Sequence, residues 1–90
     1  MYDIKFTKKA KKFLDKQDTI TKERIKNSLL KLAENPKDNI KNDIKLLKGL
    51  SETAFRLRVG DIRIVYKLDD DHSLIIVVII DSRGQIYKRL

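Results

Sequence analysis

The sequence predicts an α+β domain in which a helical hairpin packs on one face of a sheet. Apolar residues recur at helical spacing between residues 6 and 33, and they alternate with polar residues between residues 54 and 68. Helices followed by a run of strands are typical of α+β folds, in which the helices cover one sheet face. The chain has 90 residues. Since this is the size of a single hydrophobic core, we expect one domain over residues 1–90.

The first predicted elements are a short strand and a helix. Tyr2, Ile4 and Phe6 alternate with polar residues, which indicates a strand with one buried face. Thr7 is suited to cap the helix that follows. The apolar positions of that helix recur at helical spacing and are Ala10, Phe13 and Leu14. Lysines take most of the solvated positions, namely Lys8, Lys9, Lys11, Lys12 and Lys16.

A second helix is predicted to begin after Asp18 or Thr19. Its apolar stripe consists of Ile25, Leu29, Leu32 and Ala33. We expect it to end near Asn35, because Pro36 disfavours the helical conformation in the residue before it. The two helices together form the hairpin.

Three strands in an antiparallel meander complete the predicted fold. They cover Ala54–Val59, Ile62–Leu68 and Ser73–Ile80, with a turn at Asp69–His72 between the last two. The third strand is apolar on both faces, which is typical of a central strand. Residues 37–53 mix polar residues with scattered aliphatic ones, and we expect an ordered connection held to the core by the aliphatic side chains.

Charge indicates the class of partner. The formal net charge is +8 and the isoelectric point is near 9.8. Such a chain favours polyanions, because each phosphate that Lys or Arg neutralises releases counterions. Nucleic acid is therefore the first candidate, and an acidic protein is the second.

Composition also indicates a compartment. There is no cysteine, which fits a reducing cytosol, and a single histidine, His72, makes a metal cluster unexpected. The longest apolar run, Leu74–Ile80, is far shorter than a membrane span, and the N-terminus has no signal-peptide pattern. We expect a soluble cytoplasmic protein with no metal, no cofactor and no membrane partner.

The hairpin formed by the first two strands of the meander contains the candidate anion-binding residues. With Gly60 and Asp61 as a two-residue loop, Arg58 lies directly opposite Arg63. Alternation then places further basic side chains on the same face, namely Arg56 and Lys67. Like charges that face each other destabilise a sheet by some tenths of a kcal/mol, so a chain that keeps the pair is expected to use it on an anion. Salt bridges to Asp61 or to an acidic partner are the alternative explanation.

The hairpin sequence AFRLRVGDIRIVY (residues 54–66), the apolar strand after it and the terminal RGQIY (residues 83–87) resemble the RelE branch of the RelE/ParE toxin superfamily. The resemblance extends over the whole chain and includes LKG at residues 47–49. It implies a RelE-like fold and a metal-independent endoribonuclease that cuts messenger RNA in the ribosomal A site and inhibits translation. It also implies a cognate RelB-like antitoxin as partner, beside the ribosome and its message. An antitoxin segment across the arginine-bearing face would exclude RNA from it.

The resemblance assigns roles residue by residue. Arg56 and Arg58 match the basic pair of the first hairpin strand and, with Lys67, are expected to bind RNA phosphates. Arg63 matches a basic residue of the next strand, and Arg83 and Tyr87 match the terminal catalytic pair. The lysines of the first helix are candidate ribosomal RNA contacts, namely Lys8, Lys9, Lys11 and Lys12.

The implied reaction is in-line attack of a ribose 2′-hydroxyl on the adjacent phosphate. Arginine stays protonated and cannot be the base, so that role falls to Tyr87. Its phenol has an ordinary pKa of about 10, which nearby positive charge would have to lower. Arg83 would then stabilise the leaving oxygen.

The chain departs from the RelE pattern at two places. Arginines stand at 56 and 58, where better-known members carry lysines, and Asp81 and Ser82 lie near Arg83. A carboxylate beside Arg83 either orients it or weakens its pull on phosphate, which puts the rate of cleavage in doubt.

Two rival functions remain open on the sequence. The ParE branch has a similar scaffold but poisons DNA gyrase, and the presence of Arg83 with Tyr87 argues against it. A non-catalytic basic module that binds RNA or DNA is the other.

Overall fold

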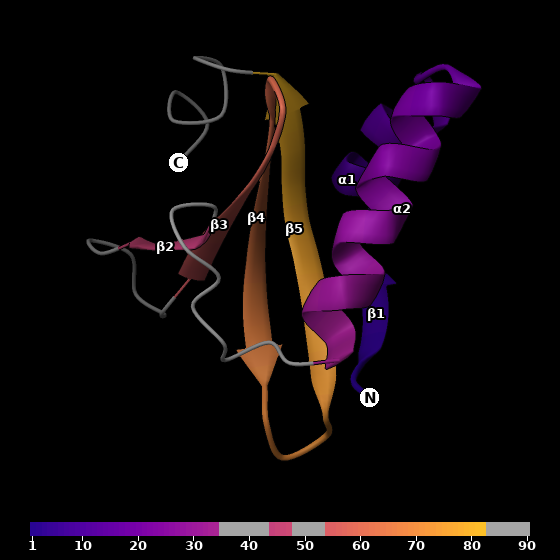
Figure 1. The fold of residues 1–90 in the computed structure, drawn as a ribbon. Helices are drawn as coiled ribbons and strands as arrows, with labels where there is room; N and C mark the ends of the chain where they lie inside the picture. Colours follow the sequence, from indigo (N-terminus) through magenta and orange to yellow (C-terminus); the bar gives the residue numbers. More distant parts are fainter. Residues whose placement is uncertain (35–43, 48–53, 83–90) are drawn as a thin grey trace.

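A five-stranded sheet carries a helical hairpin on one face (Figure 1). The structure is a computed structural model and describes residues 1–34, 44–47 and 54–82. Its elements are β1 (Asp3–Phe6), α1 (Lys8–Asp15), α2 (Thr19–Glu34), β2 (Ile44–Leu47), β3 (Ala54–Val59), β4 (Ile62–Asp69) and β5 (Leu74–Ser82). The strand order is β1-β5-β4-β3-β2. β1 runs parallel to β5, and the other neighbours are antiparallel. The predicted α+β class and meander are confirmed.

Thr7 joins the first strand to the first helix and both of them to β5. Its hydroxyl accepts a hydrogen bond from the N–H of Ala10 at 3.2 Å, which caps α1 as predicted. The same hydroxyl donates to the carbonyl of Val78 at 2.6 Å, and the backbone N–H of Thr7 donates to the carbonyl of Val77 at 3.0 Å. The start of α1 is therefore fixed against β5, an interior strand of the sheet.

The second helix follows the predicted pattern. Asp18 accepts a hydrogen bond from the N–H of Thr21 at 2.8 Å, and this bond lowers the pKa of the Asp18 carboxyl. The helix ends at Glu34, and Asn35 and Pro36 lie outside the described residues. The buried residues of α2 are Ile25, Leu29, Leu32 and Ala33, the stripe expected from the sequence.

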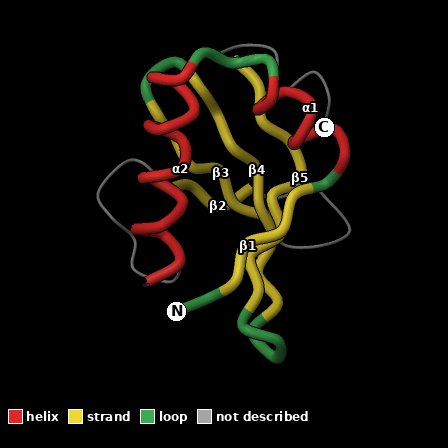
Figure 2. Tube along the Cα trace, turned by 90° about the vertical axis from the view of Figure 1, so that its right-hand side faces the viewer, coloured by secondary structure: helices red, strands yellow, loops and turns green. Residues whose placement is uncertain are grey.

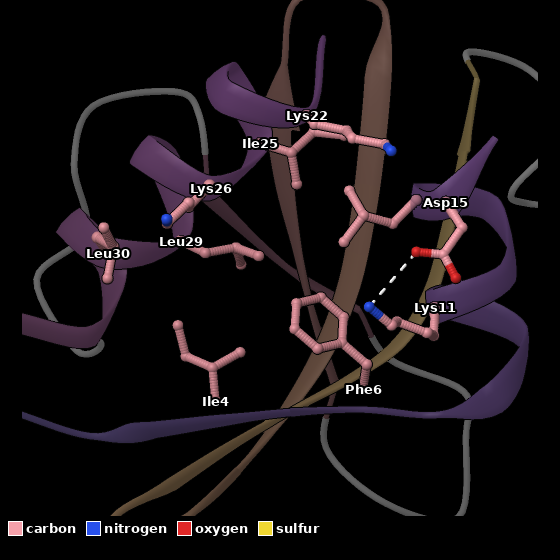
Figure 3. Close-up of a pocket in the computed structure, with 10 residues that line it drawn as sticks. Ile4, Phe6, Lys11, Asp15, Lys22, Ile25, Lys26, Leu29 and Leu30 are labelled. Atoms are coloured by element: carbon pink, nitrogen blue, oxygen red, sulfur yellow. Dashed lines mark ion pairs between the residues drawn. The ribbon is translucent and has the colours of Figure 1, made fainter. Parts of the chain in front are cut away.

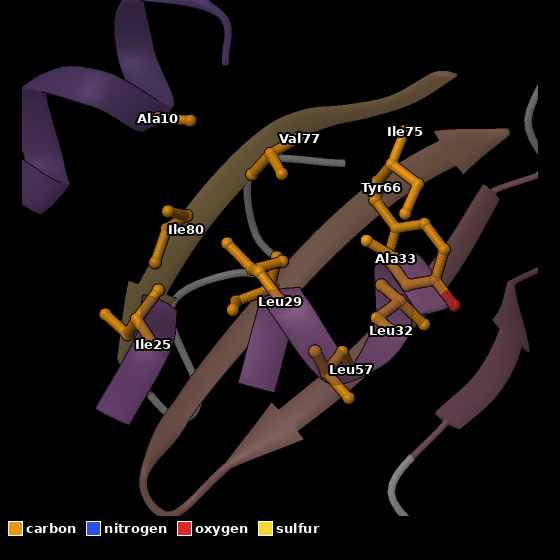
Figure 4. Packing of buried hydrophobic residues seen from close by; sticks show 11 residues of the cluster. Ala10, Ile25, Leu29, Leu32, Ala33, Leu57, Tyr66, Ile75, Val77 and Ile80 are labelled. Atoms are coloured by element: carbon orange, nitrogen blue, oxygen red, sulfur yellow. The ribbon is translucent and has the colours of Figure 1, made fainter. Parts of the chain in front are cut away.

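The core lies between the helices and the sheet (Figure 4). Helical residues pack there against side chains of three strands, namely Leu57, Ile64, Tyr66, Ile75, Val77 and Ile80. Tyr66 is fully buried, and its ring stacks on that of Phe55 with centroids 5.5 Å apart. Its hydroxyl has no hydrogen-bond partner among the residues that the structure describes. Burial raises the pKa of this phenol to about 12.

Two features of the sheet differ from the sequence prediction. Residues 44–47, expected in an ordered connection without a strand, form the edge strand β2, which pairs antiparallel with β3. β5 also continues beyond the predicted end at Ile80, to Ser82. Backbone pairing decides both features, and it can form without a local alternation of apolar and polar residues.

A β-bulge interrupts the pairing of β4 with β5. Val65 pairs with Ile79 and Tyr66 pairs with Val77, so Val78 is the extra residue. The bulge exchanges the two faces of β5. Before it, Ile75 and Val77 point into the core, whereas after it Ile80 points into the core and Ile79 lies on the opposite sheet face. The carbonyl of Val78 is the one that accepts from Thr7.

In a second view (Figure 2), α2 lies to one side of β1 and α1 to the other. Among the described residues, no helix is both long and apolar enough to cross a lipid bilayer.

Candidate nucleic-acid interface

The β3–β4 hairpin presents its arginines as the sequence predicts. Gly60 has a φ of +59°, the left-handed conformation that a tight two-residue turn requires and that glycine adopts without strain. The turn sets Arg58 directly opposite Arg63 and Arg56 opposite Val65. The predicted register is confirmed.

These side chains lie on the sheet face opposite the helices. Leu57, Ile64 and Tyr66 point into the helical core, and the alternate residues of the hairpin point the other way. There Ala54, Val65 and Ile79 form a second small apolar cluster. We call the surface formed by Arg56, Arg58 and Arg63 around this cluster the arginine face. Lys67, half-buried, follows on the same side of β4 by alternation.

The three arginines differ in environment. Arg63 is only 8% exposed, and its Nη1 donates to the carbonyl of Gly60 at 2.8 Å and to that of Ile62 at 3.3 Å. Arg58 is exposed. Arg56 is half-buried, and its Nε is buried with no hydrogen-bond partner among the described residues. A buried charged donor without an acceptor lowers the stability of the folded protein. An anion bound beside Arg56 would supply the acceptor.

Asp81 is the neighbour that the sequence did not reveal. It lies directly opposite Arg63 on β5 and is 6% exposed. Its Oδ1 accepts from the N–H of Ser82 at 2.8 Å. Without the bulge the register would set Ile80 opposite Arg63, so reasoning from strict alternation could not have found this pair. The row Arg58, Arg63, Asp81 therefore crosses three strands with a carboxylate at one end.

None of the remaining predicted site residues that the structure describes lies beside the three arginines. Arg83 and Tyr87, the expected catalytic pair, lie outside the described residues. The α1 lysines 8, 9, 11 and 12 are exposed on the helical layer, which is on the other side of the sheet from the arginine face. His72 lies in the predicted turn, where its Nδ1 is 2.8 Å from Oδ2 of Asp69.

Comparison with known families gives one match that covers most of the chain. The family model described as the ParE toxin of a type II toxin–antitoxin system, parDE, matches residues 4–87. Toxin RelG of Mycobacterium tuberculosis is 36% identical to this chain over 36 residues. That alignment covers 40% of this chain and 41% of RelG, so the chain matches less than half the length of this relative.

Solved structures share the fold over nearly the full length. The archaeal RelE–RelB complex from Pyrococcus horikoshii matches with a TM-score of 0.78 and 25% identity, covering 93% of this chain and 97% of the other. The RelB–RelE antitoxin–toxin complex from Methanococcus jannaschii matches with a TM-score of 0.72 and 28% identity, covering 96% and 98%. The isolated RelE toxin of Escherichia coli, with a TM-score of 0.70 and 24% identity over 99% and 94% of the two chains, shows the same fold.

Proposed function

Because the chain belongs to the ParE toxin family of type II toxin–antitoxin systems, within the RelE/ParE superfamily, we propose that it acts as a RelE-like, ribosome-dependent messenger RNA endonuclease that inhibits translation. We further propose a RelB-like antitoxin as its cognate partner, which is supported by the RelE–RelB complexes among its structural neighbours.

The arginine face is the observation that carries the nuclease proposal. Arg58 and Arg63 face each other across a hairpin, and Nε of Arg56 is buried without an acceptor among the described residues. A phosphate bound between the guanidinium groups would reduce the repulsion between the facing arginines and would supply an acceptor for Arg56. RNA supplies such phosphates at every nucleotide.

The fixed position of Arg63 suits it to transition-state stabilisation. Phosphoryl transfer places additional charge on the nonbridging oxygens, and a donor that is already oriented stabilises that charge without reorganising during the reaction. The hydrogen bonds from Arg63 to Gly60 and Ile62 hold its guanidinium in this way. Arg58, which is exposed, is suited to bind the incoming backbone. Arg56 and Lys67 extend the same positive surface.

In the proposed reaction the 2′-oxygen forms a bond to phosphorus while the bond from phosphorus to the 5′-oxygen breaks. Tyr87, as its phenolate, accepts the 2′-hydroxyl proton, and Arg83 stabilises the charge on the leaving 5′-oxygen, which takes a proton from water. The products are a 2′,3′-cyclic phosphate and a 5′-hydroxyl.

Single-turnover cleavage of message on programmed ribosomes, followed by primer extension, tests this proposal. Loss of one positioned donor is expected to slow cleavage by about 10²–10³-fold, the range expected for Arg63→Ala. Loss of a general base is expected to slow it by about 10²–10⁴-fold, the range expected for Tyr87→Phe. Lys31→Ala removes an exposed charge on α2 and serves as the matched control. Undiminished cleavage by Tyr87→Phe would refute its role as the base.

A second candidate function is inhibition of DNA gyrase. The family model that matches the chain is the ParE one, and this is the observation that favours it. A supercoiling assay run beside the ribosome assay separates the two functions. Inhibited supercoiling without message cleavage would favour the ParE-like function. Salt-dependent RNA binding with neither activity would indicate a non-catalytic module.

A further inference from the structure

A second surface, remote from the arginine face, is shaped to receive a partner. A groove of about 470 Å³ lies between β1, α1 and α2 (Figure 3). Its floor is apolar and is formed by Ile4, Phe6, Leu14, Ile25 and Leu29. These residues belong to the helical side of the sheet, so the groove and the arginine face lie on opposite sides of the β-sheet.

The rim of the groove is basic on both sides. Lys11 of α1 borders one side and pairs with Asp15 at 3.3 Å. Lys22 and Lys26 of α2 border the other, and neither has an ion-pair partner among the described residues. Leu30, one turn after Lys26, also lines the groove and is 41% exposed, although a leucine gains stability by burial.

The chemistry of the groove selects among occupants. RNA is disfavoured, because bases bind by stacking on aromatic rings and the floor is aliphatic except for Phe6. A second copy of this chain is also disfavoured. A two-fold contact through this groove would bring the same lysines of two chains, each with a net charge of +8, against each other. An acidic protein segment with an apolar stripe complements both the floor and the rim.

We propose that this groove is the anchoring site for an acidic amphipathic helix of the antitoxin. The apolar stripe of that helix would lie on the floor, and carboxylates beside the stripe would meet Lys22 and Lys26. The inference rests on the proposed toxin–antitoxin pairing and adds where the pairing takes place. The proposed docking site lies on the opposite side of the sheet from the arginine face. Affinity for the antitoxin therefore does not depend on the residues proposed to bind RNA.

Calorimetric titration of the full toxin with the purified antitoxin encoded beside it tests the proposal. The first variant, Lys22→Glu with Lys26→Glu, reverses the charge of the rim, and the second, Leu30→Asp, makes the groove polar. Each is expected to weaken antitoxin binding by about tenfold or more. All three residues are on the surface of α2, and circular dichroism and thermal unfolding verify that the variants fold.

The matched control is Lys5→Glu with Lys31→Glu, which makes the same change in net charge at exposed residues outside the groove. It is expected to change the dissociation constant of the antitoxin by less than about threefold, because neither residue borders the groove. Groove variants that bind as tightly as the wild type would overturn the proposal, and so would an equal loss in the control, self-association through the groove, or an antitoxin strand paired to the edge of β1.

Message cleavage by the same variants separates this inference from the proposed nuclease. The groove variants are expected to cleave ribosome-bound message at the wild-type rate while escaping inhibition by the antitoxin. If no variant cleaves but the groove variants alone lose antitoxin affinity, the nuclease proposal fails and the docking site stands.

Discussion

Burial separates residues that look equivalent in the sequence. Arg56, Arg58 and Arg63 all belong to one basic hairpin, yet only Arg58 is exposed. Arg63 donates to the carbonyl of Gly60 and lies opposite Asp81, so it contributes to the hairpin as well as to the positive potential beside Arg58. Burial depends on what covers the sheet face, and the sequence of the hairpin does not contain that information.

The burial of Tyr66, a neutral side chain, also depends on what covers the sheet face. The structure places its hydroxyl in the core with no hydrogen-bond partner among the described residues. Removing a buried hydroxyl that has no partner costs little, so we expect Tyr66→Phe to change the free energy of unfolding at pH 7 by less than about 1 kcal/mol, or to increase it. Urea denaturation measures this change. A loss of more than about 2 kcal/mol would show that the hydroxyl has a stabilising partner.

The raised pKa of Tyr66 predicts a dependence of stability on pH. The folded phenol keeps its proton up to about pH 12, whereas the unfolded phenol releases it near pH 10. The folded state then binds more protons, so the free energy of unfolding falls as pH rises from about 10 to 12. We expect wild type to lose up to about 1.4 kcal/mol per pH unit more than Tyr66→Phe in this range. Parallel pH profiles of the two proteins would contradict the assignment.

At the scale of elements, Thr7 couples a helix to the bulged strand. It caps α1 through Ala10 and donates to the carbonyl of Val78 at the bulge. We expect Thr7→Ala to lower the free energy of unfolding by about 1–2 kcal/mol, the usual effect of losing a cap. Thr7→Ser keeps the hydroxyl and is the control. Equal losses in the two variants would assign the effect to the methyl group instead of the hydrogen bonds.

The elements themselves were largely predictable. Both helices, the cap at Thr7 and the stripe of α2 follow from periodicity and from local hydrogen-bonding preferences. The strands of the meander were placed within a few residues. β2 was not predicted, because an edge strand is defined by its pairing with β3 and the segment around it has no alternation. The bulge at Val78 was not predicted for a similar reason, since Thr7, which bonds to it, is distant in the sequence.

At the scale of the whole molecule, the net charge is divided between two layers. The α1 lysines lie on the helical side and the arginine face on the other. If Arg58 contacts a phosphate, Arg58→Ala should reduce the slope of log K against log salt for a single-stranded RNA oligonucleotide by about 0.7. Fluorescence anisotropy over a range of salt concentrations measures it. Lys31→Ala should leave the slope unchanged, and an equal change in both variants would mean that RNA senses only the net charge.

The candidate site was predictable in part at this scale. The register that pairs Arg58 with Arg63 follows from Gly60 and Asp61, and the resemblance of the hairpin and terminus to RelE toxins agrees with the family match. The roles of Arg83 and Tyr87 remain a prediction, because both residues lie outside the described part of the chain. The groove was not predicted. Its lining comes from β1, α1 and α2, and only their packing leaves a space between them.

Local patterns were enough to establish that this chain has two helices before a meander and that several arginines share one sheet face. These properties depend on residues a few positions apart, where side-chain direction follows from backbone geometry. Folding decided that Asp81 rather than Ile80 lies opposite Arg63, and that lysines from two helices border one apolar groove. Those outcomes depend on contacts between segments far apart in the chain, whose relative positions are determined by the packing of the whole domain.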